Sequence, residues 1–221
     1  MIYFNEDFLK FYLELSQNNN ATWFNENRNR YEKVVKKPFF TFVFDFINRI
    51  RDFEPEIIIS PSDAIFRINR DIRFSKDKTP YKTHSSAIIS KYGRKDKFYP
   101  GIYFEFASDR IMFYGGAWSV EPKILYKIRS NIADNLSEFQ KAYKSNEFIR
   151  RFGKIQGEQS KKIPPEFNDI AKKEPLFYNK QFYFGTKLPP ELILKEELMD
   201  VLFEHYLASR QLNSFLQLAY M

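Results

Sequence analysis

The first part of the chain places its apolar residues at the spacing of an α-helix. Apolar side chains lie three or four positions apart after Asn5, a residue that favours helix N-caps because its side chain accepts a bond from a backbone N–H. The pattern predicts a first helix that ends in the polar run 17–20 and a second helix capped by Thr22. Pro38 is expected to break or kink that second helix. A third helical stretch is predicted over residues 39–53.

The middle of the chain changes to a period of two, which is typical of half-buried β-strands. Residues 64–75 alternate apolar and polar side chains, and Arg70 falls on the apolar face. Residues 85–90 and 101–107 are predicted as further strands, and residues 111–114 as the hairpin partner of the latter. We therefore expect a largely antiparallel sheet at the centre of the fold.

The last part of the chain returns to helical spacing. Pro122 is expected to open a long helix, since proline suits the first helical position, and Gly153 to end a short helix over residues 146–152. The other predicted elements are a surface loop over 154–175, a strand over 181–184 and a final helix over 190–219. Helices thus flank the strands, and the order predicts one α+β domain over residues 1–221. Its central, mostly antiparallel sheet is flanked by N-terminal, middle and C-terminal helices.

Composition excludes several classes of protein. The chain has no cysteine, which excludes disulfides, thiolate catalysis and cysteine-bound metal, and its two histidines and scattered carboxylates lack metal-ligand spacing. We therefore predict no metal and no cofactor. The chain also lacks a secretory leader and any apolar run of about 18 residues, so we expect a cytoplasmic protein with no membrane contact. The oligomeric state is not indicated.

The net charge is concentrated in one segment. Residues 66–97 contain ten Lys or Arg and three Asp, and 10 − 3 = +7 equals the charge of the whole chain. The other 189 residues carry 25 basic and 25 acidic groups. A segment of this kind attracts anions through its summed field. The predicted partner is an anionic small molecule, with nucleic acid as the alternative.

Candidate ligand-binding residues lie in the core of this segment, which reads Arg-Asp-Ile-Arg-Phe-Ser-Lys-Asp-Lys-Thr-Pro-Tyr-Lys. Arginine offers a planar fork of donors that fits phosphate or carboxylate, and Arg70 on an apolar face needs an anionic partner. The candidates are Arg70, Arg73, Asp77, Lys78, Tyr81 and Lys82. The alternative is a solvated charged ladder in which Arg67, Asp71 and Arg73 alternate along a strand.

His84 follows this segment directly and is a candidate general base, because imidazole changes its charge near neutral pH. Tyr81 is the other candidate for proton handling. The alternative for His84 is a structural role, which is commoner for a lone histidine. His205, in the final predicted helix, is expected to be structural.

Gly115 and Gly116 form a second candidate contact for an anion. They are expected to interrupt the strand pattern before the helix that Pro122 opens, and bare backbone before a helix N-terminus is a known way to hold an anion. The spacing of a full phosphate loop is missing, so a glycine bulge between hairpin and helix is the alternative. We predict that these glycines and the Arg70–Lys82 segment come together in one concave site.

These residues resemble the uncharacterised bacterial family DUF2461. The resemblance runs in the expected order from about Phe8 to Leu207 and is most specific between Arg70 and Lys82. It is carried by Asn18-Asn19, Trp23-Phe24, Phe66-Arg67-Ile68, Arg70-Asp71, Arg73-Phe74, Asp77-Lys78, Pro80-Tyr81-Lys82, Gly115-Gly116 and Pro122. The resemblance implies a shared domain and points to the same segment. It implies no reaction, cofactor or catalytic residue.

Three functions stay open on the sequence alone. The first is a pocket for a phosphate- or carboxylate-bearing small molecule, with enzymatic activity undecided. The second is a nucleic-acid-binding module, in which basic groups contact phosphates and aromatic rings stack on bases. The third is a structural salt-bridge network. Asp71 and Asp77 lie among the cations and would repel a continuous phosphate backbone, which favours the first function over the second.

Overall fold

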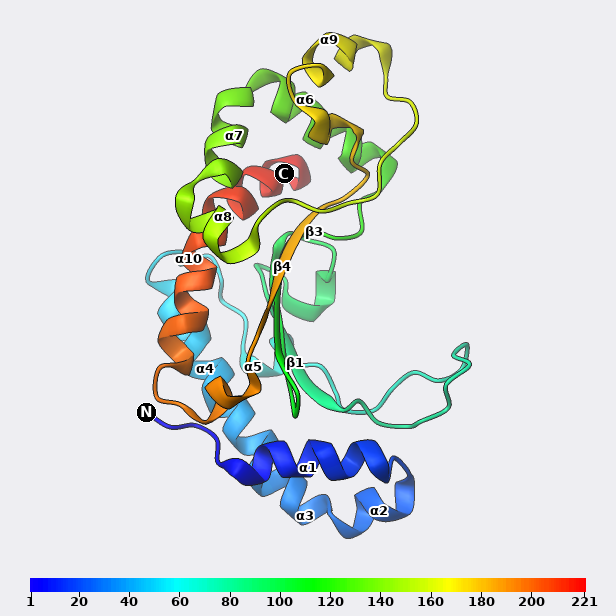
Figure 1. Cartoon of the computed structure of the whole chain (residues 1–221), viewed down its shortest axis with the longest axis vertical. Coiled ribbons are helices and arrows are strands. Elements are labelled where there is room, and N and C mark those ends of the chain that lie inside the picture. The colour runs from blue at the N-terminus through cyan, green and yellow to red at the C-terminus, as the bar shows by residue number, and fades with distance from the viewer. The chain divides into compact units, whose positions relative to one another are not determined.

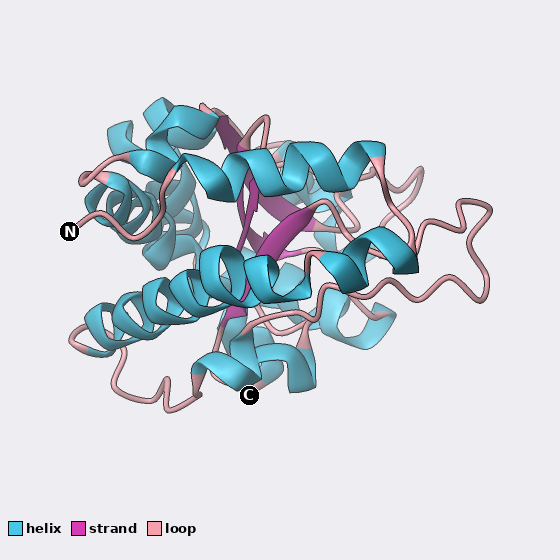
Figure 2. Cartoon of the chain, turned by 90° about the horizontal axis from the view of Figure 1, so that it is seen from below, coloured by secondary structure: helices cyan, strands magenta, loops and turns pink.

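The computed structural model describes residues 1–221 and shows helices together with a four-stranded antiparallel sheet in the order β1-β2-β3-β4, which confirms the α+β class (Figures 1 and 2). The strands are β1 (His84–Ile89), β2 (Gly101–Ala107), β3 (Ile111–Ala117) and β4 (Phe182–Leu188). The helices are α1 (Glu6–Gln17), α2 (Ala21–Glu26), α3 (Arg28–Arg30), α4 (Lys37–Arg51), α5 (Pro61–Ala64), α6 (Pro122–Asp134), α7 (Leu136–Lys144), α8 (Asn146–Phe152), α9 (Asn168–Ala171) and α10 (Leu198–Gln217).

The chain divides into two compact units, each built from three segments. Unit 1 comprises Met1–Lys95, Tyr103–Phe113 and Lys187–Phe203. Unit 2 comprises Asp96–Ile102, Tyr114–Thr186 and Glu204–Met221. A single domain over the whole chain stays a prediction.

Aromatic rings fill the core of unit 1. Phe106 on β2 lies 5.5 Å from Phe39 and 5.2 Å from Phe42 on α4, measured between ring centroids, and Phe4 lies 5.6 Å from the same ring. Phe104, two residues earlier on β2, contacts the same helix through Phe46 at 5.6 Å. Alternate residues of a strand share a face, so these contacts place α4 against the Phe104 and Phe106 face of β2. The opposite face carries Tyr103 and Glu105.

The N-terminal helices begin where polar side chains satisfy their first N–H groups. Asn5 accepts a bond from the N–H of Asp7 at 3.1 Å, which confirms the predicted start of α1. The cap of α2 is Asn20 rather than Thr22, and its side chain accepts from the N–H of Trp23 at 3.0 Å. The prediction of Thr22 was therefore wrong. Asparagine is at least as favourable as threonine at a cap position, and Asn20 precedes Thr22 in the chain, so the helix starts earlier than expected.

The helical backbone continues through Pro38, but its hydrogen bonding changes just before that residue. A π-helical segment, Tyr31–Lys36, leads into α4, and Pro38 lies in the first turn of that helix. Arg30, Lys36 and Lys37 all keep right-handed helical dihedrals, and the N–H of Lys37 bonds to the carbonyl of Glu32, five residues back. Regular α-helical bonding is thus disturbed in the turn before Pro38, as expected for a residue that lacks an N–H and crowds the preceding turn. A kink of the helix at Pro38 stays a prediction.

The predicted strand over residues 64–75 is also wrong. Residue 64 ends the short helix α5, and beyond it the chain makes only isolated bridges, Ile65 to Ala87 and Asn69 to Tyr81. The N–H of Phe66 bonds to the carbonyl of Ser86, whereas the N–H of Lys82 bonds to the carbonyl of Ile68. Between these two bonds, residue 67 on one segment lies opposite three residues, 83–85, on the other. This bulge interrupts the ladder of backbone hydrogen bonds. Beyond it the chain forms a long loop, drawn in teal between α5 and β1 in Figure 1.

In unit 2, β3 runs through the two glycines that were expected to end it. Close packing explains both positions: a Cβ on Gly115 would collide with the ring of Phe184, and one on Gly116 would collide with the carbonyl oxygen of Phe182. Gly116 also has a φ of +90°, which glycine adopts readily. The prediction of a strand end at Gly115 was wrong, because the two glycines lie within β3 and their lack of a side chain lets β4 pack closely against it.

The helices of unit 2 follow the predicted order with two changes. The helix opened by Pro122 ends at Asp134 and a second one starts at Leu136, while α8 covers the predicted 146–152. The expected helix over 190–219 starts only at Leu198, after a 3₁₀ turn at Pro190–Leu194, and crosses from unit 1 into unit 2. None of the helices combines the length with the apolar composition needed to cross a bilayer.

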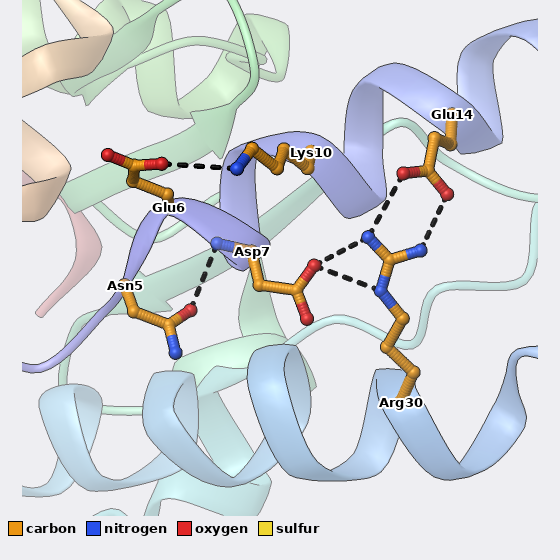
Figure 3. Close-up of polar contacts among 6 residues, drawn as sticks. All are labelled: Asn5, Glu6, Asp7, Lys10, Glu14 and Arg30. Carbon is orange, nitrogen blue, oxygen red and sulfur yellow. Dashed lines mark hydrogen bonds and ion pairs between the residues drawn. The ribbon is translucent and has the colours of Figure 1, made fainter.

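A three-residue ion-pair cluster, which we call the Arg30 staple, joins α1 to α3 within unit 1 (Figure 3). The Arg30 guanidinium donates to Asp7 at 2.5 Å and to Glu14 at 2.5 Å, and two further bonds to the same carboxylates complete the fork. These bonds lower the pKa of the Glu14 carboxyl, with the hydrogen bond from Arg30 as the main cause. A second pair on α1, from Lys10 to Glu6, is exposed.

Candidate functional site

Arg70 is held by residues of its own loop. Its guanidinium donates to the carboxylate of Asp77 and to the hydroxyl of Thr79, and its side chain is 26% exposed. The predicted carboxylate partner for Arg70 is thus confirmed, although the residue lies in a loop and not in the sheet. Asp77 also accepts from the N–H of Thr79 at 2.9 Å. The Thr79 backbone bond and then Arg70 lower the pKa of Asp77 to about 2.

The other cations of the loop also contact the loop itself. Arg73 donates from Nε and Nη2 to Asp71 at 2.9 and 2.7 Å, in a pair whose arginine side chain is 76% exposed. This pair lowers the pKa of Asp71 to about 2. Lys78 donates to the carbonyl of Ile72 at 2.9 Å. These contacts give Arg70, Arg73, Asp77 and Lys78 a role in shaping the loop, and their predicted role in ligand binding stays a prediction.

Tyr81 points into the core of unit 1. Its ring stacks on Phe24 with centroids 4.0 Å apart, and its residue is 7% exposed. The side chain of Asn19 donates to the Tyr81 carbonyl at 2.9 Å and accepts from its N–H at 3.1 Å. An amide side chain that bonds in this way replaces a neighbouring strand and fixes the base of the loop. The catalytic role predicted for Tyr81 stays untested, and its position favours a structural role.

The side chains of His84 on β1 and of Tyr103 and Glu105 on β2 lie close together in unit 1, near Lys82, which precedes β1 by two residues, and we call these four residues the sheet-face cluster. His84 Nε2 lies 3.4 Å from Glu105 Oε1, and the Tyr103 hydroxyl donates to the same oxygen at 2.6 Å. Neighbouring strands bring these residues together, because residues two apart on a strand share a face. The result is a chain of polar contacts from Tyr103 through Glu105 to His84.

Burial dominates the electrostatics of this cluster. The side chains of His84 and Glu105 are only 20% and 17% exposed. Burial lowers the pKa of His84, Glu105 opposes that shift, and the charges of Lys82 and Arg110 add to it. Burial is also the main reason that the pKa of Lys82 is lowered, with Glu105 acting against it and Arg67 and Arg94 adding to it.

Lys82 is the cation of this cluster that lacks a carboxylate partner. It is half-buried, forms no ion pair, and lies with Nζ 5.0 Å from the centroid of the Phe66 ring. Phe66 in turn contacts Tyr103 edge-on at 5.9 Å. Arg67 is exposed and also forms no ion pair, and the bulge places its backbone opposite His84. Two cations without counter-ions thus lie next to a half-buried acid–base pair.

The predicted glycine contact belongs to unit 2. The N–H of Gly116 donates to the side chain of Asn213 at 2.8 Å, and Gly115 lies against the Phe184 ring. The predicted site shared by Gly115, Gly116 and the Arg70–Lys82 segment stays a prediction, because those glycines and that segment lie in different units. The close packing of both glycines supports their structural alternative.

Sequence reasoning missed the two residues that complete the cluster, Tyr103 and Glu105. Both lie in a strand that the sequence did predict, and the alternation Tyr103-Phe104-Glu105-Phe106 places a carboxylate and a hydroxyl on one face of it. A carboxylate between aromatic residues in a strand was the signal that could have found them. Nothing in the sequence linked that strand face to His84.

Comparison with known proteins gives one result. A family model described as "Conserved hypothetical protein (DUF2461)" matches residues 7–215 of this chain, nearly its whole length. No curated protein and no solved structure matches it. No group of three His, Asp or Glu side chains is placed to hold a metal ion.

Proposed function

We propose that this chain, which belongs to the conserved hypothetical family DUF2461, binds a small molecule through a phosphate or carboxylate group at the sheet-face cluster. The observation that carries the proposal is Lys82: a half-buried ammonium group without a carboxylate partner. Burying an unpaired charge is costly, so the anion that relieves the cost is expected to come from a ligand. The family match adds no activity to this argument.

The contrast with the neighbouring loop supports this choice of residues. Arg70 and Arg73 already hold carboxylates of their own loop, so a ligand would have to displace Asp77 or Asp71 to reach them. Arg67 and Lys82 face no such competition. Anion binding therefore requires the fewest rearrangements at the sheet-face cluster, where Lys82 is the half-buried cation and Arg67 is an exposed cation beside the cluster. A cytoplasmic location, where phosphorylated metabolites are abundant, forms part of the same proposal.

A matched pair of lysines tests the proposal. Lys82 lies over the Phe66 ring at 5.0 Å, and the exposed Lys91 lies over the Tyr92 ring at 5.5 Å, so Lys82→Met and Lys91→Met remove the same charge from similar surroundings. We expect phosphate monoesters or carboxylates at millimolar concentration to raise the melting temperature of the wild type and of Lys91→Met, but not that of Lys82→Met. Equal responses from all three proteins would rule out Lys82 as the binding group.

Nucleic acid is the second candidate, and one feature of the loop favours it. Phe74 is 96% exposed, and the guanidinium carbon of Arg73 lies 5.8 Å from its ring centroid. An exposed ring beside a cation suits a stacked base with a neighbouring phosphate. Fluorescence titration with a single-stranded oligonucleotide at two salt concentrations would test this function, with Phe74→Ala as the variant. Binding that weakens with salt and is lost in Phe74→Ala would support it.

The structural alternative is an outcome of the same measurements. If no anion and no oligonucleotide stabilises the protein, while Arg70→Met is destabilised, the loop contacts of Arg70 serve the fold alone. The contacts from Arg70 to Asp77 and Thr79 are the basis for that reading.

A further inference from the structure

The sheet-face cluster contains a proton-accepting group that anion binding alone does not require. His84 contributes one ring nitrogen, Nε2, to its contact with Glu105, and the other, Nδ1, forms no hydrogen bond. Because Glu105 faces Nε2, that nitrogen carries the proton of the neutral ring and Nδ1 is the acceptor. The Tyr103 hydroxyl donates to the Glu105 carboxylate at 2.6 Å, and the same carboxylate oxygen lies 3.4 Å from Nε2 of His84. The imidazole is thereby held in one orientation. An oriented histidine with an available acceptor is the arrangement used for proton transfer.

Burial is the main obstacle to a second proton on His84, and the charges around the ring modify its effect. The charged groups that act on the ring are Lys82 from the segment before β1, Glu105 from β2 and, beyond β2, the guanidinium of Arg110, whose exposed partner is Asp109. Arg67 lies opposite the bulge that contains His84, and Arg94, which bonds to the carbonyl of Ser62, acts on Lys82. In the free protein these cations oppose a further positive charge on the ring. A bound anion would cancel that opposition.

Building on the proposed anion site, we infer that a phosphate monoester dianion is the ligand and that its binding places a proton on Nδ1 of His84. The proton comes from solvent, an N–H bond forms on the ring, and no other covalent bond changes. The charges favour a dianion: Arg110 is paired with Asp109 and Arg94 is held at the Ser62 carbonyl, and the remaining groups, Lys82, its neighbour Arg67 and protonated His84 against Glu105, give 3 − 1 = +2. A single carboxylate would leave this site with excess positive charge.

Anion binding and protonation of His84 strengthen each other, because the two equilibria are thermodynamically linked. An anion held near Lys82 stabilises the imidazolium form, so the pKa of His84 is higher in the complex than in the free protein. For an anion that stays a dianion throughout, such as sulfate, affinity is then greatest below the pKa of His84 in the free protein and falls as the pH rises through the pKa of the complex. A shift of about one pKa unit corresponds to about a tenfold change in affinity across that window.

The chain offers a clean probe because it has only two histidines, His84 and His205. Proton NMR of the imidazole carbon-bound protons can follow both through a pH titration, in potassium sulfate and in potassium chloride at equal ionic strength. Sulfate is a suitable probe because it stays a dianion throughout the titration, whereas phosphate itself changes charge. We expect sulfate to raise the pKa of His84 by about one unit and to leave His205 unchanged. His84→Gln assigns the resonances.

Two variants separate this inference from the proposed function. Lys82→Met removes the anion site and should abolish the sulfate-dependent shift of His84. Glu105→Gln keeps the cations but removes the group that holds the imidazolium, so sulfate should still raise the melting temperature with a smaller shift of His84. If sulfate stabilises the wild type through Lys82 and the His84 titration does not move, the inference is overturned and anion binding stands. If sulfate neither stabilises the protein nor shifts His84, both proposals fail.

Discussion

Unit 1 contains two charged clusters that are built on opposite principles. In the Arg30 staple, one arginine is shared by two carboxylates and all three guanidinium nitrogens donate to them (Figure 3). In the sheet-face cluster, the single carboxylate of Glu105 lies against His84, and Lys82 forms no ion pair and has a second cation, Arg67, nearby. The staple is complete within the chain, whereas the sheet-face cluster has positive charge left over. The difference separates charges that hold elements together from charges that are available to a ligand.

The largest effect should come from removing the shared arginine of the staple. In Arg30→Met, Asp7 and Glu14 lose their common partner, and the link from α1 to α3 is lost. The two carboxylates are 39% and 44% exposed, so solvent screening limits the expected loss in free energy of unfolding to about 1–2 kcal/mol. Urea denaturation measures it. A loss as small as that of a typical surface variant would show that the staple contributes no more than an exposed ion pair.

In the sheet-face cluster, removing a cation is expected to leave the free energy of unfolding unchanged or to raise it, and not to lower it. Lys82→Met removes a half-buried ammonium that has no ion pair and keeps an aliphatic chain over Phe66. Without ligand, we expect the free energy of unfolding to stay the same or to rise by about 0.5 kcal/mol, because burying an unpaired charge opposes folding. The same urea experiment decides, with Lys91→Met as the control. A loss comparable to that of Arg30→Met would mean that Lys82 has a structural partner and would break the comparison.

The two clusters should also lose stability in different pH windows. Burial lowers the pKa of His84 below its ordinary value of 6.5, so the unfolded chain binds that proton more readily. The stability present above pH 6.5 is therefore lost as the pH falls below it. The hydrogen bond from Arg30 lowers the pKa of Glu14 below 4.5, so the staple weakens only below that pH. Urea denaturation of the wild type and of His84→Gln between about pH 7.5 and about pH 5 should show a difference that changes with pH. Parallel curves would contradict the burial of His84.

The smallest effect is expected at the exposed pair of the loop. The Arg73 side chain is 76% exposed, and its contact with Asp71 lies between neighbours in sequence. We expect Arg73→Gln to leave the melting temperature unchanged, since exposed ion pairs contribute little to stability. Thermal unfolding with and without sulfate checks both the fold and the ligand. A lost response to sulfate in this variant would move the anion site from Lys82 to the loop.

The sequence located the elements better than it located the contacts between them. Local signals were sufficient for α1, where Asn5 caps a periodic helix, and for α8, which Ser145 caps and Gly153 ends. The strand over 64–75 failed because alternation records only which side chains face inward. Ala64 and Ile68 are buried, but Phe74 on the same predicted face is 96% exposed, and alternation says nothing of a backbone ladder interrupted by a bulge.

The candidate site shows the same division. The segment that carries the net charge, and within it Lys82 and His84, could be read from the residues, because charge and residue type are local properties. Glu105 and Tyr103 come from a separate strand, and only the pairing of β1 with β2 brings them to His84. The partners of the loop arginines come from the loop itself: Arg70 pairs with Asp77 and Arg73 with Asp71, whereas Arg67 forms no ion pair. The sequence by itself determined the composition, the charged segment and most helices, since these depend on neighbours along the chain. Which charges stay available was decided by burial and by distances between segments far apart in sequence, and those exist only in the folded chain.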